Sequence, residues 1–345
     1  MPIITGKLRQ KLKNVRDGAR QLSYKAGTHA IHYRLVSGAF NRENEAVFAG
    51  VREHYKKVDA GSEVFELRRR IHMVEKGLSM RPRRNTFAAG YINMLLDRLE
   101  QALRLGILED ETVAWARDVL DGYFEATSES KDTEIARARE RYAVIRLESP
   151  LPYCGPAVPV PPAVAFDPEV VSALAHHRRS VRWYLDKPVD RAIVDDAITV
   201  AVEAPTACNR VPYRFHIFDD PDDATRIASI AGGTVGYVEN LQSVVVLVGD
   251  LSAYVDERDR HLIYIDGSLA AMGFIYSLEA HGVATCCINW PDLKEPEKEM
   301  AQVLGLAPYE RVVMLIAYGY ADPTGLAPAS PKRPLTATRL YSKLD

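Results

Sequence analysis

Hydrophobic side chains recur at intervals of three and four residues through much of the first 148 positions. In residues 62–78 this spacing predicts a helix with one apolar stripe, formed by Val64, Leu67, Ile71, Val74 and Leu78. Residues 89–105 repeat the pattern with Ile92, Leu95, Leu96, Leu99 and Leu103. Residues 110–126 and 133–147 are two further helical segments. We therefore expect an α-helical N-terminal extension over residues 1–148.

The pattern changes at a proline-rich segment. Residues 149–165 contain six prolines and a glycine. Proline lacks an amide donor and disfavours helix in the residue before it. This segment is therefore expected to be extended, either as a linker or as a strap that lies on a surface.

Residues 166–345 mix helical and strand patterns. Asp167 followed by Pro168 is typical of a helix start, and we expect this helix to end near residue 177. Further helices are expected at 189–204, 266–281 and 295–304. Short runs rich in β-branched residues predict buried strands at 214–218, 243–249, 284–289 and 311–318. Such a mixture predicts an α+β or α/β layered domain.

The length and charge of the chain narrow the functional classes. A chain of 345 residues exceeds a typical single domain and favours two structural units. Its 44 basic and 46 acidic residues give a net charge of −2, whereas a dedicated nucleic-acid-binding domain is basic overall. The apolar runs are too short for a membrane-spanning helix, and no signal peptide is expected. Four cysteines without such a signal predict reduced thiols in a cytoplasmic protein.

Two local segments are basic despite the near-neutral total. Residues 7–25 form a predicted amphipathic helix with cations on its polar faces. Such a helix packs within the protein, packs on a dimer mate, or lies on an anionic membrane surface. Residues 68–84 carry eight cationic side chains when His72 is counted, as either a solvated face or a contact for an anionic ligand. Gly77 is expected to cap the C-terminal end of the helix that carries it.

Two segments of the sequence have a composition that suits ligand binding. The sequence contains no phosphate-binding P-loop, dinucleotide-binding glycine motif, zinc-protease motif or nucleophile elbow. Residues 178–182, with the sequence RRSVR, form either a phosphate grip or a charged helix end. Residues 204–213, with the sequence APTACNRVPY, either let a flat ligand approach the backbone or form an ordinary helix-to-strand loop.

Four segments together carry a resemblance to a known family. They are RRSVRWY at 178–184, APTACNRVPYRF at 204–215, DGSLAAMGFIYSLEAHGVATC at 266–286 and ERVVMLIAYGYAD at 310–322. In order and spacing they resemble the nitroreductase-like family of FMN-dependent oxidoreductases. The resemblance covers residues 167–342 and implies an α+β sandwich that forms a homodimer with FMN at the interface. The sequence RRRIHMVEKGLSM at 68–80 resembles a subgroup associated with surface-polysaccharide biosynthesis.

The resemblance implies cofactor contacts in the first two segments. In the first segment the implied contacts are Arg178, Arg179, Ser180 and Arg182. They would hold the phosphate, the ribityl chain and the pyrimidine edge, and Arg182 is implied to tune the flavin. Thr206 and Asn209, on a turn shaped by Pro205, are implied to reach the flavin of the other subunit.

The strand exit and the C-terminal segment complete the implied set. The strand exit contributes Cys287, Ile288, Asn289 and Trp290. The backbone amide of Asn289 is implied to lie near flavin N5. Lys332 and Arg333 are implied to return to the phosphate.

Several residues of these segments can also be explained by a purely structural role, without any contact to a cofactor. Cys286 and Cys287 are typical of inert packing at a strand end, and Trp290 is typical of a core residue. Lys332 and Arg333 are equally consistent with a solvated tail, and Asp266 with a simple helix N-cap.

Two positions depart from the family pattern. Val211 stands where many members have glutamine, and Trp290 stands where glycine is common. Both changes are expected to affect the choice of substrate more than the retention of flavin.

By this resemblance the chain is an FMN-dependent oxidoreductase in which NAD(P)H and a small organic acceptor react in turn, by a ping-pong scheme. No catalytic side chain and no metal are implied, because the cofactor carries the chemistry. Two alternatives stay open: a reductive dehalogenase-type reaction, and a non-catalytic or regulatory subunit of an assembly such as a polysaccharide pathway. The sequence leaves open the physiological substrate, the choice between NADH and NADPH, and the role of the helical extension.

Overall fold

The computed structural model describes residues 31–145, 147–156 and 166–344, together with positions 11, 14, 15, 18, 22, 24, 27 and 28. Most of the basic helix predicted at 7–25 lies outside the described residues. The same is true of residues 157–165 in the proline-rich segment.

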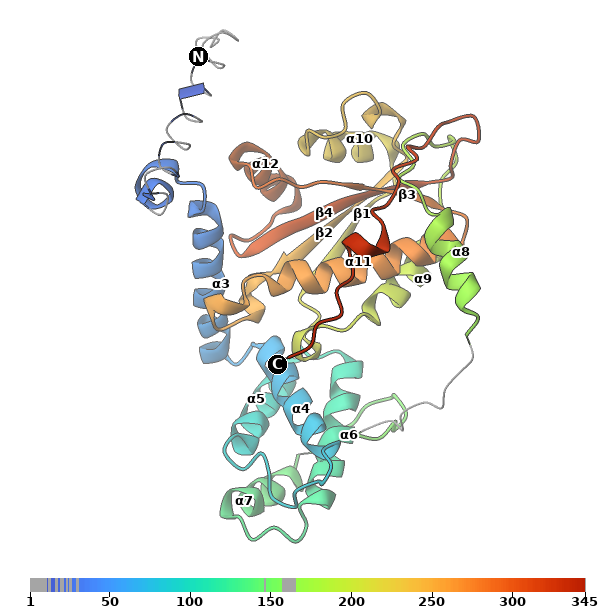
Figure 1. Ribbon diagram of the computed structural model, residues 1–345. Coiled ribbons are helices and arrows are strands. Elements are labelled where there is room, and N and C mark those ends of the chain that lie inside the picture. Colours follow the sequence, from blue (N-terminus) through green and yellow to red (C-terminus); the bar gives the residue numbers. More distant parts are fainter. Residues whose placement is uncertain are drawn as a thin grey trace.

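The N-terminal region is helical, as its hydrophobic stripes predict (Figure 1). The elements are η1 (His32–Ser37), α3 (Asn41–Ala60), α4 (Val64–Leu78), α5 (Ile92–Leu105), α6 (Asp110–Ala126) and α7 (Thr133–Tyr142). The apolar faces of α4, α5 and α6 form one core, in which Leu67, Leu96 and Tyr123 are fully buried. The Glu63 and Asp132 side chains cap α4 and α7 by accepting backbone amide hydrogen bonds.

Helix α3 packs against the C-terminal half rather than joining the core of α4–α6. Ala46 shares a buried cluster with Leu251, Tyr254 and Ile263. Gly50 permits this approach, because a Cβ atom there would lie 2.8 Å from the Leu251 backbone. The two halves of the chain are therefore in direct contact along α3.

The expectation that Gly77 caps α4 is wrong. Helix α4 continues to Leu78, and Ser79 is its C-cap. A Cβ atom on Gly77 would lie 2.4 Å from the Phe87 ring. The glycine therefore gives room to a packed aromatic side chain.

The C-terminal half is built around one antiparallel sheet. Its strands are β1 (Tyr213–Phe218), β2 (Ser243–Asp250), β3 (Ala284–Ile288) and β4 (Glu310–Gly319), in the order β1-β2-β4-β3. Its α-helices are α8 (Pro168–His177), α9 (Arg191–Val202), α10 (Pro221–Ile230), α11 (Leu262–Ala280) and α12 (Lys294–Leu304). Short 3₁₀ turns are η2 (Ala207–Asn209), η3 (Val238–Asn240), η4 (Leu251–Ala253), η5 (Glu257–Asp259) and η6 (Leu335–Ala337).

Helices cover both faces of this sheet (Figure 1). Val244 and Val246 of β2 pack in a core with α10 and α12. Val245 and Leu247 point the other way and pack with α9 and α11. Because both faces are buried, β2 is apolar at successive positions instead of alternating with polar residues. The fold is α+β with a helical N-terminal region, as predicted.

The described part of the proline-rich segment lies on α6. The backbone amides of Cys154 and Gly155 donate hydrogen bonds to Oδ2 of Asp118 at 2.7 and 3.1 Å. Arg117 donates from Nη2 to the Pro152 carbonyl at 3.1 Å. This part is a strap on the helical region, and the domain limits at 148 and 165 stay predictions.

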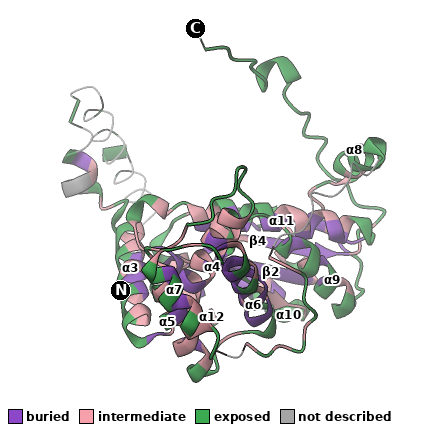
Figure 2. Cartoon of the chain, turned by 90° about the horizontal axis from the view of Figure 1, so that it is seen from below, coloured by how far each residue is buried: buried purple, intermediate pink, exposed green. Residues whose placement is uncertain are grey.

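The C-terminal segment after β4 is exposed over residues 323–344 and projects from the body of the molecule (Figure 2). In the described part of the chain, no helix has the length and apolar character needed to cross a membrane.

Candidate functional site

The arginine-rich segment at 178–184 lies along β3, an edge strand of the sheet. The Val181 amide donates a hydrogen bond to the Thr285 carbonyl at 3.0 Å, and Ser180 pairs with Thr285 as an isolated bridge. The buried Tyr184 hydroxyl donates to the Val181 carbonyl at 2.7 Å. These contacts fix the segment beside the strand exit that begins at Cys287.

A cavity of about 830 Å³, here called the arginine cavity, opens beside the C-terminal end of α8. One side is cationic, and the side formed by α11 includes Met272, Ile275 and Tyr276. The lining also includes five of the predicted cofactor residues: Arg178, Arg179, Ser180, Cys287 and Lys332. The structure thus brings the first segment, the strand exit and the C-terminal segment to one place.

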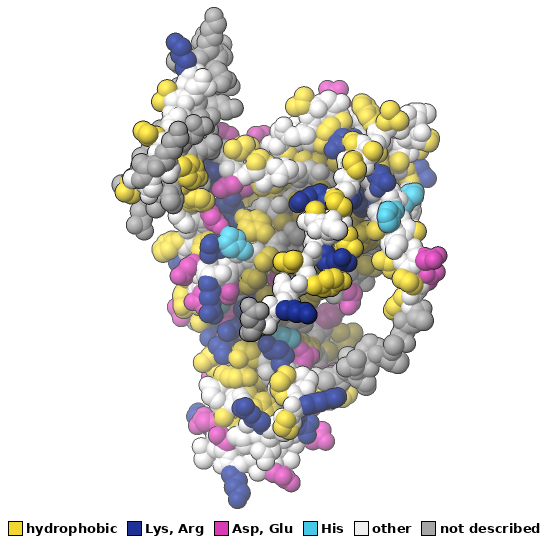
Figure 3. Space-filling model, in the orientation of Figure 1, with side chains coloured by type: hydrophobic (Ala, Val, Ile, Leu, Met, Phe, Trp, Pro, Cys, Tyr) yellow, Lys and Arg dark blue, Asp and Glu magenta, His cyan; other side chains and the backbone are white. Residues whose placement is uncertain are grey.

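The cations of the arginine cavity carry uncompensated charge. Within the described residues, Arg178, Arg179 and Lys332 form no salt bridge, whereas Arg191 and Arg214 elsewhere are paired with carboxylates. Arg179 uses Nη1 to donate to the neighbouring Arg178 carbonyl at 3.1 Å. Free guanidinium groups beside an apolar wall favour a ligand that combines an anionic group, such as phosphate, with a flat apolar part. Figure 3 shows Lys and Arg side chains among hydrophobic ones in the area where, in this view, the projecting C-terminal segment passes in front of α11.

Arg182 lies beside the arginine cavity rather than in its lining. It donates from Nη1 to the Ser180 carbonyl at 3.3 Å, and its guanidinium lies 5.5 Å from the Tyr237 ring centroid. Burial raises the pKa of the Cys286 thiol, although the charge of Arg182 partly offsets the effect. Cys286 is therefore a neutral packed thiol at neutral pH, in keeping with inert packing.

The turn at 204–211 lies apart from the arginine cavity, against α4 and the first turns of α11. Its backbone is strained, because Cys208, Asn209 and Val211 have φ angles of 59°, 53° and 52°. Non-glycine residues in this region cost on the order of 1–3 kcal/mol each. The Ala207 amide donates to Oδ2 of Asp266 at 2.9 Å, which fixes one end of the turn.

The interpretation of Asp266 as a helix N-cap is wrong. Helix α11 starts at Leu262 and His261 occupies the N-cap, so Asp266 lies inside the helix. Its carboxylate is nearly buried, and burial raises its pKa while the Ala207 amide and the Arg210 charge act against the rise. Asp266 therefore serves as a buried acceptor for the turn.

Helix α11 connects the turn to the arginine cavity. Asp266 holds the turn, and Tyr276 lines the cavity ten positions later on the same helix. With a rise of 1.5 Å per residue, these positions are about 15 Å apart. Pro205, Thr206 and Asn209 therefore do not share the cavity of their own subunit. The prediction that Thr206 and Asn209 reach the flavin of a second subunit stays a prediction.

The remaining predicted residues lie at the edges of the site. Ile288 is buried in the sheet core, so only its backbone can contact a ligand, and Asn289 is exposed. Trp290 packs against the same core and donates from Nε1 to Glu297 at 2.5 Å. Arg333 is exposed and does not line the arginine cavity.

Comparison with known proteins agrees with the motifs. The model of the nitroreductase family matches residues 175–240 and 236–320. The resemblance of the C-terminal half to this family is confirmed.

A "NADH dehydrogenase" of Thermus thermophilus is 27% identical over 179 residues, which cover 43% of this chain and 85% of that protein. YdgI of Bacillus subtilis is 26% identical over 191 residues, which cover 44% of this chain and 88% of that protein. The solved structure of NfrA1 of B. megaterium has a TM-score of 0.46 and 20% identity, and the match covers 51% of this chain and 75% of that one.

The sequence did not single out several residues of the nitroreductase-like half. His176, Met272 and Tyr276 line the arginine cavity. For Met272 and Tyr276 the only signal was the largely apolar character of the 266–281 segment, which is unusual for a helix that covers a sheet.

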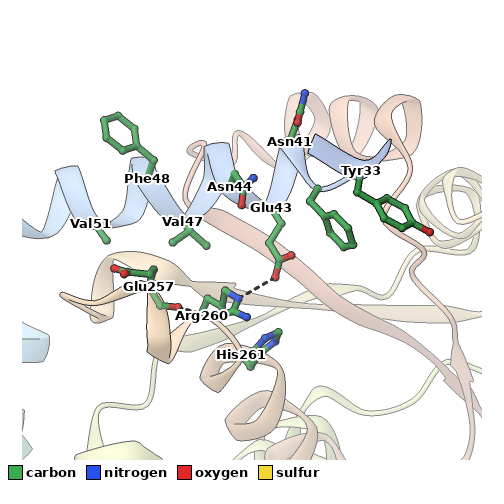
Figure 4. Close-up of a pocket in the computed structure, with 11 residues that line it drawn as sticks. Tyr33, Asn41, Glu43, Asn44, Val47, Phe48, Val51, Glu257, Arg260 and His261 are labelled. Carbon is green, nitrogen blue, oxygen red and sulfur yellow. Dashed lines mark hydrogen bonds and ion pairs between the residues drawn. The ribbon is translucent and has the colours of Figure 1, made fainter. Parts of the chain in front are cut away.

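A second cavity of about 820 Å³ lies between α3 and the residues that precede α11 (Figure 4). Tyr33, Val47 and His261 are part of its lining, and Glu43 forms an ion pair of 3.8 Å with Arg260 beside it. The cavity contains none of the predicted cofactor residues.

The basic run at 68–84 is partly neutralised by contacts within the helical region. Arg69 and Arg70 both pair with Glu66, at 3.1 and 2.6 Å. His72 lies 3.0 Å from a carboxylate oxygen of Glu75. These side chains are engaged, which leaves less of the run for an anionic ligand.

Proposed function

We propose that the chain is an FMN-dependent oxidoreductase that takes electrons from NAD(P)H and passes them to a small organic acceptor. The observation that carries the proposal is the arginine cavity, in which Arg178, Arg179 and Lys332 lie together without an acidic partner among the described residues. The nitroreductase-family match, which includes Arg178 and Arg179 but ends before Lys332, and the name of the Thermus relative support the reaction class.

The residues present fit FMN. The cations of the arginine cavity would hold its phosphate, and Ser180 supplies a hydroxyl beside them. The α11 side of the cavity, with Met272 and Ile275, suits the apolar part of the cofactor. When bound, FMN would supply the acceptance and transfer of a hydride or electrons.

The side chains of this chain would bind and orient rather than act as nucleophiles or bases. Positive charge at Arg178 and Arg182 would favour negative charge that develops on a ligand held next to them. The thiol of Cys286 stays protonated and takes no part. Catalysis would then depend on how well the cavity holds its ligand and excludes water.

A homodimer is part of the proposal. Helix α11 is largely apolar around its whole circumference, which is typical of a helix that is covered on all sides. One stripe of it is nevertheless only partly covered in the single chain, and includes Ile265 (52% exposed), Leu269 (46% exposed), Met272 and Tyr276. A second copy on this stripe would bury it and bring a further turn at 204–211 towards the arginine cavity. A cytoplasmic location stays a prediction from the cysteine content.

The test is a visible spectrum of the purified protein, followed by addition of FMN to any colourless protein and then of NADH or NADPH without oxygen. We expect a flavin spectrum that a nicotinamide bleaches. Arg178→Ala and Arg182→Ala should lose the flavin, whereas Arg191→Ala, which removes a surface arginine paired with Asp219, should keep it. A protein that cannot be loaded with FMN would contradict the proposal.

The second candidate, a non-catalytic flavin-fold subunit, gives a different result in the same experiment. It predicts a yellow protein that neither nicotinamide bleaches. The helical N-terminal region, which has its own core and contacts the nitroreductase-like half, is the observation that keeps this candidate open.

A further inference from the structure

The strained turn at 204–211 needs stabilising contacts, because left-handed angles at non-glycine residues persist only where neighbouring groups hold them. Two of these contacts lie within the turn. The Val211 amide donates to Oγ1 of Thr206 at 3.2 Å, and Arg210 donates from Nη1 to the Ala207 carbonyl at 3.0 Å. Neither contact touches the Asn209 carbonyl.

The Asn209 carbonyl is held from the helical N-terminal region. Arg68 of α4 donates from Nε to this oxygen at 2.9 Å, although the two residues are 141 positions apart. The same guanidinium donates from Nη1 to Oγ1 of Thr112 at 2.7 Å and lies 5.1 Å from the Trp115 ring centroid. Arg68 is therefore fixed by α6 at one side while it binds the turn at the other.

The hydrogen bond from Arg68 restricts the backbone at Asn209, the residue that is predicted to contact the cofactor. With the carbonyl held by a charged donor, the peptide unit after Asn209 cannot rotate without the loss of a strong hydrogen bond. The Asn209 side chain is exposed and makes no hydrogen bond within the described residues. The contact therefore fixes the backbone from which this exposed side chain extends.

We propose that the helical N-terminal region holds the 204–211 turn in its cofactor-binding shape, with Arg68 as the positioning residue. The inference rests on the proposed function, because the role of the turn at FMN is part of it. The helical region would thus act at the site through the turn, although none of its described residues lines the arginine cavity.

The experiment compares the FMN affinity of flavin-free wild type, Arg68→Ala and Arg68→Lys, measured by quenching of flavin fluorescence. We expect Arg68→Ala to weaken FMN binding by about tenfold or more, since a hydrogen bond from a charged donor is lost. Arg68→Lys should recover only part of the affinity, because an ammonium cannot reproduce the guanidinium fork. Guanidinium ion at low millimolar concentration should restore binding to Arg68→Ala, and the visible circular dichroism of bound FMN should change in the variants.

The control is Arg104→Ala, which removes an exposed arginine from the last turn of α5 and should bind FMN as the wild type does. If Arg68→Ala does not fold, as judged by its melting curve, the FMN affinity of Arg68→Lys tests the inference instead. Unchanged affinity and dichroism in both Arg68 variants would overturn the inference alone. A wild type that does not bind FMN would refute the proposed function, and the inference with it.

Discussion

Nδ1 of His54 in α3 lies 3.8 Å from Oε2 of Glu63, which precedes α4. Both side chains are almost fully buried where the helical region meets the nitroreductase-like half. Oε1 of Glu63 accepts the Phe65 amide at 2.9 Å, whereas Oε2 has no hydrogen-bond partner among the described residues. Burial raises the pKa of Glu63 to about 7, against the charge of Lys57. Burial lowers the pKa of His54.

The raised pKa of Glu63 makes the stability of the protein depend on pH. Between the ordinary pKa of 4.5 and about 7, the folded state binds the proton of Glu63 more tightly than the unfolded state does. Glu63 therefore lowers the free energy of unfolding as the pH rises through this window, and the full loss is present above it. Glu63→Gln keeps the capping oxygen and removes the charge. We expect this variant to gain about 2–3 kcal/mol over the wild type between pH 5 and pH 8.

The measurement for Glu63 is urea unfolding of both proteins at several pH values. The residues around position 63 are the same in both proteins, so the difference between them reports the change at Glu63. A difference in the free energy of unfolding that is the same at pH 5 and pH 8 would show that Glu63 does not titrate in this window.

Gly50 tests the contact between α3 and η4, the turn that follows β2. A Cβ atom there would lie 2.8 Å from the Leu251 backbone, which cannot move aside as a flexible side chain could. We expect Gly50→Ala to lower the free energy of unfolding by about 1–3 kcal/mol. Gly267→Ala is the matched control in α11, since its nearest neighbour is Val313 at 3.4 Å and alanine favours helix by up to about 1 kcal/mol. Equal stability of the two variants in urea unfolding would contradict tight packing at Gly50.

The sequence predicted most of the fold because large apolar side chains mark the buried faces. Helix α8 begins at Pro168 after the Asp167 cap, as predicted, and all four strands lie within two residues of their predicted limits. Helix α3 lies in the region expected to be helical, but no stripe marked it, because its buried face uses Ala46 and other small residues. Helix α10 was missed, although the Asp220 cap followed by Pro221 is the same signal that located α8.

The site was only partly predictable, for a physical reason. Short motifs located the arginines at 178–182 and the strand exit at 287–290, because each of these groups consists of residues that are close together in the sequence. The contacts of Arg68 with Asn209 and of Asp266 with Ala207 join residues 141 and 59 positions apart. Such contacts depend on how the two halves pack, which no local pattern of the chain records.

The unpaired cations of the arginine cavity should discriminate between flavins that differ only in the phosphate. We expect Lys332→Ala to weaken FMN binding by about tenfold or more while riboflavin binding stays the same, because riboflavin lacks the group that the ammonium would hold. Lys343→Ala, in the same exposed C-terminal segment, is the matched control. The measurement is titration of each flavin-free protein with both flavins at fixed ionic strength. An equal loss for FMN and riboflavin would indicate that Lys332 acts on the shape of the cavity and not on a phosphate.

The apolar stripe of α11 should determine the oligomeric state. Leu269 lies between Ile265 and Met272 on this stripe, so Leu269→Arg would place a charge within the proposed subunit contact. A buried charge without a partner is costly, and we expect the variant to be monomeric by size exclusion with light scattering. Because the turn of a second subunit would then be missing, the variant should also bind FMN more weakly.

The control for Leu269 is Val303→Arg on α12, which packs against the opposite face of the sheet. Val303 is 36% exposed, so arginine there should leave both the oligomeric state and FMN binding unchanged. Circular dichroism should show that both variants keep their helical content. A wild-type chain that is monomeric at micromolar concentration, or a Leu269→Arg variant that stays dimeric, would contradict a dimer formed through this stripe. Monomers that bind FMN as tightly as the wild type would show instead that one subunit completes the site.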